Sequence, residues 1–132
     1  MRIIIGITGS SGVIYGIKTM ESLHSLAIET HLILSEWGSN TIKIETDTDP
    51  SKVKSLASYC YDNKNMAAPI SSGSFRTDGM VIIPCSMRTL ASFSNGFDDT
   101  LISRAANVCI KENRKLIIVP RETPLSKIHL EN

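Results

Sequence analysis

A strand, a sharp turn and a helix are predicted at the very start of the chain, where residues 2–16 read RIIIGITGSSGVIYG. The uninterrupted β-branched run at residues 3–5 is typical of a parallel strand that is covered on both faces. Gly9 and Gly12 allow a tight turn and a close approach to a ligand. The free N–H groups of a helix start favour an anion. The stretch therefore indicates either a phosphate-binding turn or a plain strand-to-helix junction with a serine cap, and it matches neither the dinucleotide nor the P-loop fingerprint.

The same pattern of an apolar run followed by helix-compatible sequence recurs along the chain. Strands are predicted at residues 3–7, 31–34, 80–83 and 116–119. Strands that alternate with helices form right-handed crossovers and hence a parallel sheet. The chain is thus predicted to be one domain, residues 1–132, with a three-layer α/β/α, Rossmann-like (flavodoxin-like) fold.

The connecting segments carry weaker signals. Residues 47–64 are irregular, although Pro50 can start a helix. Residues 64–75 form a long loop rich in serine, and Ser126 could cap a last short helix.

Hydroxyl groups follow three of the predicted strands. Ser11, Ser35 and the turn at residues 86–89 all lie just after a strand. Ligands of open α/β sheets bind beyond the carboxyl ends of the strands, so these positions are expected to share one phosphate-bearing ligand. Arg88 either pairs with that phosphate or is an exposed residue beside a helix cap.

Composition narrows the possible classes. The net charge of +1 argues against a general nucleic-acid surface, and no apolar run approaches the roughly 20 residues of a membrane span. Nothing resembles a signal peptide, so a cytoplasmic location is expected. The three cysteines fit neither a disulfide framework nor a zinc site, and Cys60 and Cys109 are expected to be buried thiols.

Several motifs together resemble the UbiX-type flavin prenyltransferases. They read GITGSSGVIYG, ETHLILSEW, IETD, ISSGSF, DGMVIIPCSMRTL, RAANVCIKE and KLIIVPRETPLSKIHLEN. They occur in the order and at the spacing of that family and cover essentially the whole chain.

The resemblance implies an enzyme that attaches a dimethylallyl group, taken from dimethylallyl phosphate, to reduced FMN. The prenylated FMN would serve a UbiD-type decarboxylase of aromatic or phenolic acids. The resemblance also implies a homo-oligomer, from trimer to dodecamer, and no metal.

The same resemblance implies two sets of site residues. Those matching the flavin contacts are Gly9, Ser10, Ser11, Ser35, Ser86, Met87, Arg88, Thr89 and Arg121. Those matching the reaction chamber are Glu45, Arg104, Lys111 and Glu122. Arginine and lysine would stabilise the departing phosphate, and a carboxylate such as Glu122 would help to move the ring proton.

Two alternatives remain beside this expectation. Members of the family continue beyond the point that matches Asn132, so the chain is expected to lack their C-terminal segment with part of the prenyl-phosphate site. It could then be a non-catalytic FMN-binding or decarboxylase-associated subunit. A flavin-dependent cysteine-type decarboxylase shares the fold, but depends on an active-site histidine and a Pro-Ala-Ser-Ala-Asn-Thr motif that this chain does not contain.

Overall fold

The computed structural model describes all residues from 1 to 132 and contains one five-stranded sheet. Every neighbouring pair of strands is parallel, and the order across the sheet is β3-β2-β1-β4-β5. The strands are β1 (Arg2–Ile7), β2 (Glu29–Leu34), β3 (Tyr59–Asp62), β4 (Gly79–Cys85) and β5 (Lys115–Pro120). The four strands predicted from apolar runs are confirmed, and so is their parallel direction.

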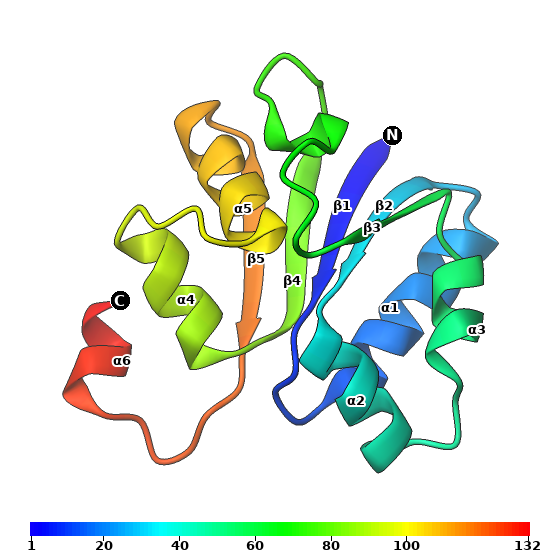
Figure 1. Cartoon of the computed structure of the whole chain (residues 1–132), viewed down its shortest axis with the longest axis horizontal. Helices are drawn as coiled ribbons and strands as arrows, with labels where there is room; N and C mark the ends of the chain where they lie inside the picture. Colours follow the sequence, from blue (N-terminus) through cyan, green and yellow to red (C-terminus); the bar gives the residue numbers. More distant parts are fainter.

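Helices cover both faces of the sheet (Figure 1). The helices are α1 (Val13–Ser25), α2 (Glu36–Glu45), α3 (Pro50–Ser55), α4 (Met87–Ser94), α5 (Leu101–Lys111) and α6 (Lys127–Glu131), with a short 3₁₀ turn, η1 (Pro69–Ser71). Helices α1, α2 and α3 lie on one side, and α4 and α5 lie on the other. The predicted three-layer α/β/α fold is confirmed. The short α6 begins at the predicted cap, Ser126, and lies apart at the C-terminus. No helix in the structure combines the length and the apolar character needed to cross a membrane.

Alternate residues of β1 divide the core in two. Ile5 and Ile7 pack with Val13 and Ile17 of α1, whereas Ile4 packs in the cluster formed with α4 and α5. Successive side chains of a strand point to opposite faces, so an unbroken apolar strand has to be covered on both sides. This explains why the isoleucine run at residues 3–5 predicts a strand in the middle of the sheet.

The edge strand β3 was not predicted, whereas the helix beginning at Pro50 is confirmed as α3. Tyr59, Cys60 and Asp62 are exposed, because β3 has a neighbour on one side only. An edge strand of this kind carries no apolar run, and the sequence signal is therefore missing.

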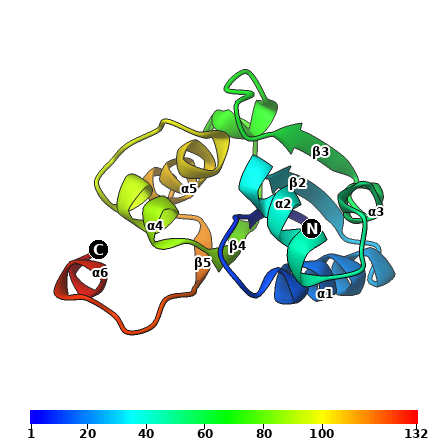
Figure 2. The same ribbon diagram turned by 60° about the horizontal axis from the view of Figure 1, so that its bottom comes forward.

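The chain changes direction across the sheet between β1 and β4. The chain leaves β1 toward α1 on one face, and leaves β4 toward α4 on the other. At such a switch point the loops that follow the strands separate and leave a crevice at the carboxyl edge. Figure 2, which brings this edge forward, shows α2 and α4 on either side of it.

Candidate functional site

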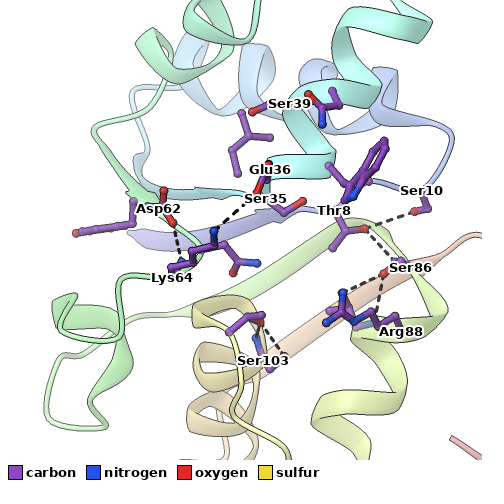
Figure 3. Close-up of a pocket in the computed structure, with 18 of the residues that line it drawn as sticks. Thr8, Ser10, Ser35, Glu36, Ser39, Asp62, Lys64, Ser86, Arg88 and Ser103 are labelled. Atoms are coloured by element: carbon purple, nitrogen blue, oxygen red, sulfur yellow. Dashed lines mark hydrogen bonds and ion pairs between the residues drawn. The ribbon is translucent and has the colours of Figure 1, made fainter.

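A cavity of about 980 Å³ opens at the carboxyl edge of the sheet. Its lining comes from the segments that follow β1, β2, β3 and β4 and from the start of α5. Six of the residues predicted for the flavin line it, namely Gly9, Ser10, Ser35, Ser86, Arg88 and Thr89. In Figure 3, Ser10, Ser35 and Ser86 gather near Thr8, and Ser103 and Asp62 lie across the opening.

Three helices begin at this cavity, and a serine caps two of them, α2 and α4. Ser35 accepts a hydrogen bond from the Gly38 N–H at 2.9 Å, at the start of α2. Ser86 accepts one from the Thr89 N–H at 3.2 Å, at the start of α4. The first N–H groups of a helix have no partner within the helix, and together they attract an anion. The two helix starts therefore form a site suited to a phosphate.

Thr8 holds the loops after β1 and β4 together. Its buried hydroxyl donates to the carbonyl oxygen of Pro84 at 2.6 Å and accepts from the Ser86 N–H at 3.0 Å. Because Thr8 follows β1 directly and both of these bonds go to the end of β4, this side chain ties the start of the loop after β1 to the start of the loop after β4.

The loop between β1 and α1 needs glycine at two positions. A Cβ at Gly9 would lie 2.5 Å from the Cβ of Trp37, and the Gly9 carbonyl accepts a hydrogen bond from Thr41 at 2.8 Å. Gly12, which precedes α1, has a φ of +96°, a conformation that other residues rarely adopt. The loop therefore packs tightly against α2.

Ser11 does not line the cavity but bonds to Glu45 at the far end of α2. The Ser11 hydroxyl donates to one carboxylate oxygen of Glu45 at 2.5 Å, and the Gly12 N–H donates to the other at 3.0 Å. These hydrogen bonds, with a smaller contribution from the positive charge of Arg121, hold the pKa of Glu45 below its ordinary value. Glu45 and Ser11 thus form one unit that ties the glycine loop to α2.

The other residues predicted for the reaction chamber do not meet in the cavity of a single chain. Arg104 donates to Asp98 at 2.9 Å and to the Ser71 carbonyl at 2.9 Å. Lys111 pairs with Glu112 at the end of α5, near the opposite edge of the sheet. Glu122, Arg121 and Met87 lie outside the cavity lining as well. The roles predicted for these residues remain predictions.

A second polar group of the cavity was not predicted from the sequence. Ser92 donates to Asp99 at 2.8 Å, and its hydroxyl lies 3.0 Å from that of Ser103. The Ser103 hydroxyl in turn lies 2.9 Å from that of Thr100, the cap of α5. A serine or threonine before an amphipathic run is a recognisable helix cap. Thr100 is therefore the one residue of this polar group that the sequence could have pointed to.

The cysteines show no sign of reactivity. Burial raises the pKa of the Cys85 thiol to about 12. Cys109 is buried, as expected, but the expectation for Cys60 is wrong, since Cys60 is exposed at the edge strand β3. All three are free.

Comparison with known proteins agrees with this geometry. The sequence model of the family described as Flavoprotein matches residues 1–131. The chain belongs to this family. It is 54% identical over 131 residues to the mitochondrial flavin prenyltransferase PAD1 of Saccharomyces cerevisiae, covering 99% of the chain and 54% of that protein. It is 53% identical to the flavin prenyltransferase LpdB of Lactiplantibacillus plantarum, covering 99% of the chain and 71% of that protein.

Solved structures show the same similarity. A crystal structure of AnUbiX (PadA1) in complex with FMN and dimethylallyl pyrophosphate superposes with a TM-score of 0.97 at 55% identity, covering 98% of this chain and 69% of that one. The crystal structure of a dodecameric FMN-dependent UbiX-like decarboxylase from Escherichia coli O157:H7 superposes with a TM-score of 0.97 at 49% identity. The match covers 99% of this chain and 71% of that one. The structure of the cysteine decarboxylase TvaF superposes with a TM-score of 0.75 over 99% of this chain and 80% of that one. At 15% identity, this similarity shows a shared fold alone. The chain spans between 54% and 66% of the length of the first three curated relatives.

Proposed function

We propose that this chain is a flavin prenyltransferase that binds FMN at the carboxyl edge of its sheet. In this proposal it transfers a dimethylallyl group from dimethylallyl phosphate to reduced FMN. The observation that carries the proposal is the close similarity, over nearly the whole chain, to a protein crystallised with FMN and dimethylallyl pyrophosphate. The product would serve a UbiD-type decarboxylase.

The donor groups of the cavity fit the phosphate of FMN. Ser10, Ser35, Ser86 and Thr89 supply hydroxyls, and the starts of α2 and α4 supply backbone N–H groups. Arg88 adds a positive charge at the cavity wall. A phosphate needs several donors at once, and the first N–H groups of a helix that no cap accepts supply them from fixed positions. The Ser86 hydroxyl, which donates to Thr89 at 3.0 Å, would turn toward the phosphate. We therefore assign the phosphate of FMN to the space between α2 and α4.

The roles proposed for the remaining residues follow from charge. Reduced FMN supplies the electron-rich ring to which the dimethylallyl group is attached. Arg104 and Lys111 would stabilise the negative charge of the leaving phosphate. Glu122 would accept the ring proton that is released when the dimethylallyl group bonds to a ring carbon. Because Arg104 and Lys111 do not reach the cavity of their own chain, a second copy has to bring them there, in agreement with the expected homo-oligomer.

Mass measurement of the flavin tests the proposal directly. The purified chain is incubated anaerobically with reduced FMN and with dimethylallyl phosphate or dimethylallyl pyrophosphate. Because the dimethylallyl group replaces a hydrogen of reduced FMN, the released flavin is expected to gain the mass of one dimethylallyl group less one hydrogen atom. Comparison of the two donors shows which phosphate ester is used.

The same measurement addresses the alternative of an FMN-binding subunit without turnover. The observation favouring that alternative is that the four residues predicted for the reaction chamber do not meet in one chain. Bound FMN of unchanged mass, with either donor, would support it and would contradict the proposed transferase.

A further inference from the structure

Trp37 is the only tryptophan of the chain, and it lines the cavity with 67% of its surface exposed. It lies in the first turn of α2, two residues after the cap Ser35. An isolated exposed aromatic residue is common on protein surfaces. An aromatic side chain at the wall of a ligand cavity is the kind of group that orients a ligand.

The backbone of α2 at Trp37 and Gly38 packs closely against the end of β1 and the loop that follows it. Gly9 packs directly against its Cβ and carbonyl group, since a Cβ at Gly9 would lie 2.5 Å and 3.0 Å from the Cβ and carbonyl carbon of Trp37. At the next residue of α2, a Cβ at Gly38 would lie 2.7 Å from the Ile7 carbonyl oxygen, so α2 is pressed against the end of β1. The indole therefore extends from a fixed point beside the glycine loop.

The other apolar groups of the cavity offer much less surface. Only four of the 22 lining residues are hydrophobic. Leu34 is 6% exposed, and one face of the Tyr61 ring is stacked against His31 with centroids 5.8 Å apart. Cys60 carries a small side chain. Trp37 is thus the one large aromatic surface in a cavity whose wall is otherwise polar.

We propose that Trp37 stacks on the isoalloxazine ring of bound flavin and fixes its orientation in the cavity, an inference that rests on the proposed function. The polar groups at the starts of α2 and α4 hold a phosphate, but a flat aromatic ring system needs an apolar partner. Stacking on indole provides this partner, and offset aromatic pairs are stabilised beyond the area they bury. Trp37 then sets the orientation of the ring at the end of the ribityl chain opposite the phosphate.

Two independent measurements on substituted chains test this role. FMN affinity is measured by ultrafiltration, and the emission of bound FMN is measured separately, because stacked indole quenches flavin fluorescence on contact. Trp37→Leu is expected to weaken FMN binding about tenfold and to raise the emission of bound FMN. Trp37→Phe keeps an aromatic face and is expected to lose less affinity. The matched control is Phe97→Leu, since Phe97 is 65% exposed and lies outside the cavity lining.

The outcomes separate this inference from the proposed function. Unchanged affinity and unchanged emission in Trp37→Leu would overturn the stacking role while leaving the transferase proposal standing. A changed oligomeric state in light scattering, with unchanged FMN affinity, would also overturn it and would assign Trp37 to a contact between copies. A chain that binds no FMN at all would contradict the proposed function, and the stacking role with it.

Discussion

At the amino edge of the sheet, polar and aromatic side chains form a closed cluster, whereas at the carboxyl edge the hydrogen-bonded side chains also line an open cavity. Arg2 donates to Glu29 at 2.6 Å, and Glu29 also accepts from the ring of His31 at 2.9 Å. The other ring nitrogen of His31 lies 2.9 Å from the Tyr61 hydroxyl, and the Arg2 guanidinium lies 4.6 Å from the centre of the Phe75 ring. These groups satisfy each other.

The same difference appears in the charges. The hydrogen bonds from Arg2 and His31 hold the pKa of Glu29 below its ordinary value, so the carboxylate stays charged and its charge is balanced within the amino-edge cluster. At the carboxyl edge, the first N–H groups of α2 and α4 have no partner within their helices. The amino-edge cluster therefore has a structural role, whereas the helix starts at the carboxyl edge are suited to binding a ligand.

The largest effect is expected at Gly9. Gly9→Ala would place a Cβ 2.5 Å from that of Trp37, and the glycine loop would have to move away from α2. We expect FMN binding to weaken about 100-fold, as if two charge-assisted hydrogen bonds were lost. Calorimetric titration measures this. The control is Gly6→Ala, where the nearest atom would lie 3.4 Å away; equal losses in both variants would contradict the role of the loop.

A substitution at the amino edge is expected to change stability with little effect on binding. His31 is 2% exposed, and His31→Leu removes both of its hydrogen bonds while keeping an apolar side chain. The free energy of unfolding should fall by about 1–3 kcal/mol, because Glu29 and Tyr61 lose a buried partner. Tyr61, the stacking partner of His31, also lines the cavity, so FMN affinity is expected to fall only slightly, by about twofold at most. Urea denaturation with FMN titration measures both, and a parallel loss of affinity would remove the distinction between the two edges.

Ser86 should influence both properties to a smaller extent. Ser86→Ala removes the cap of α4, which costs about 1 kcal/mol of stability. It also removes a hydroxyl from the proposed phosphate site, so FMN binding should weaken about tenfold. Ser126→Ala is the matched control, because Ser126 caps the exposed α6 away from the cavity. If both variants bind FMN equally well, the phosphate does not lie at the start of α4.

The smallest effect is expected for the pH dependence of Glu45. Because the folded-state pKa of Glu45 lies below its ordinary value of 4.5, its hydrogen bonds stabilise the fold fully above that pH. This contribution is lost as the pH falls through the folded-state pKa. The stability difference between the wild type and Glu45→Gln should therefore be largest near neutral pH and shrink below about pH 4. Thermal unfolding from pH 7 to pH 3 checks this, and a constant difference would contradict it.

Much of the fold and part of the site could be predicted from the sequence. The runs at residues 3–5 and 80–83 are short, apolar on both faces and rich in β-branched residues, which is typical of covered strands, so both strands were predicted. Ser35 and Ser86 follow such strands directly and begin helices. Since parallel strands end at one edge, their convergence followed from the topology.

The rest depended on contacts that sequence does not show. The exposed strand β3 lacks an apolar run, and with it the cavity residues Asp62 and Asn63 were missed. Ser11 bonds to Glu45, 34 positions away, because the end of α2 happens to meet the glycine loop. The distance of Lys111 from the cavity is set by the length and direction of α5.

A crystal structure of the chain with FMN would show at once where the phosphate and the ring system bind. We expect the phosphate within hydrogen-bond distance of Ser86 and Thr89 and beside the start of α2, with the ring system in the cavity at the carboxyl edge. FMN bound at the amino edge, or with its phosphate away from both helix starts, would contradict the account.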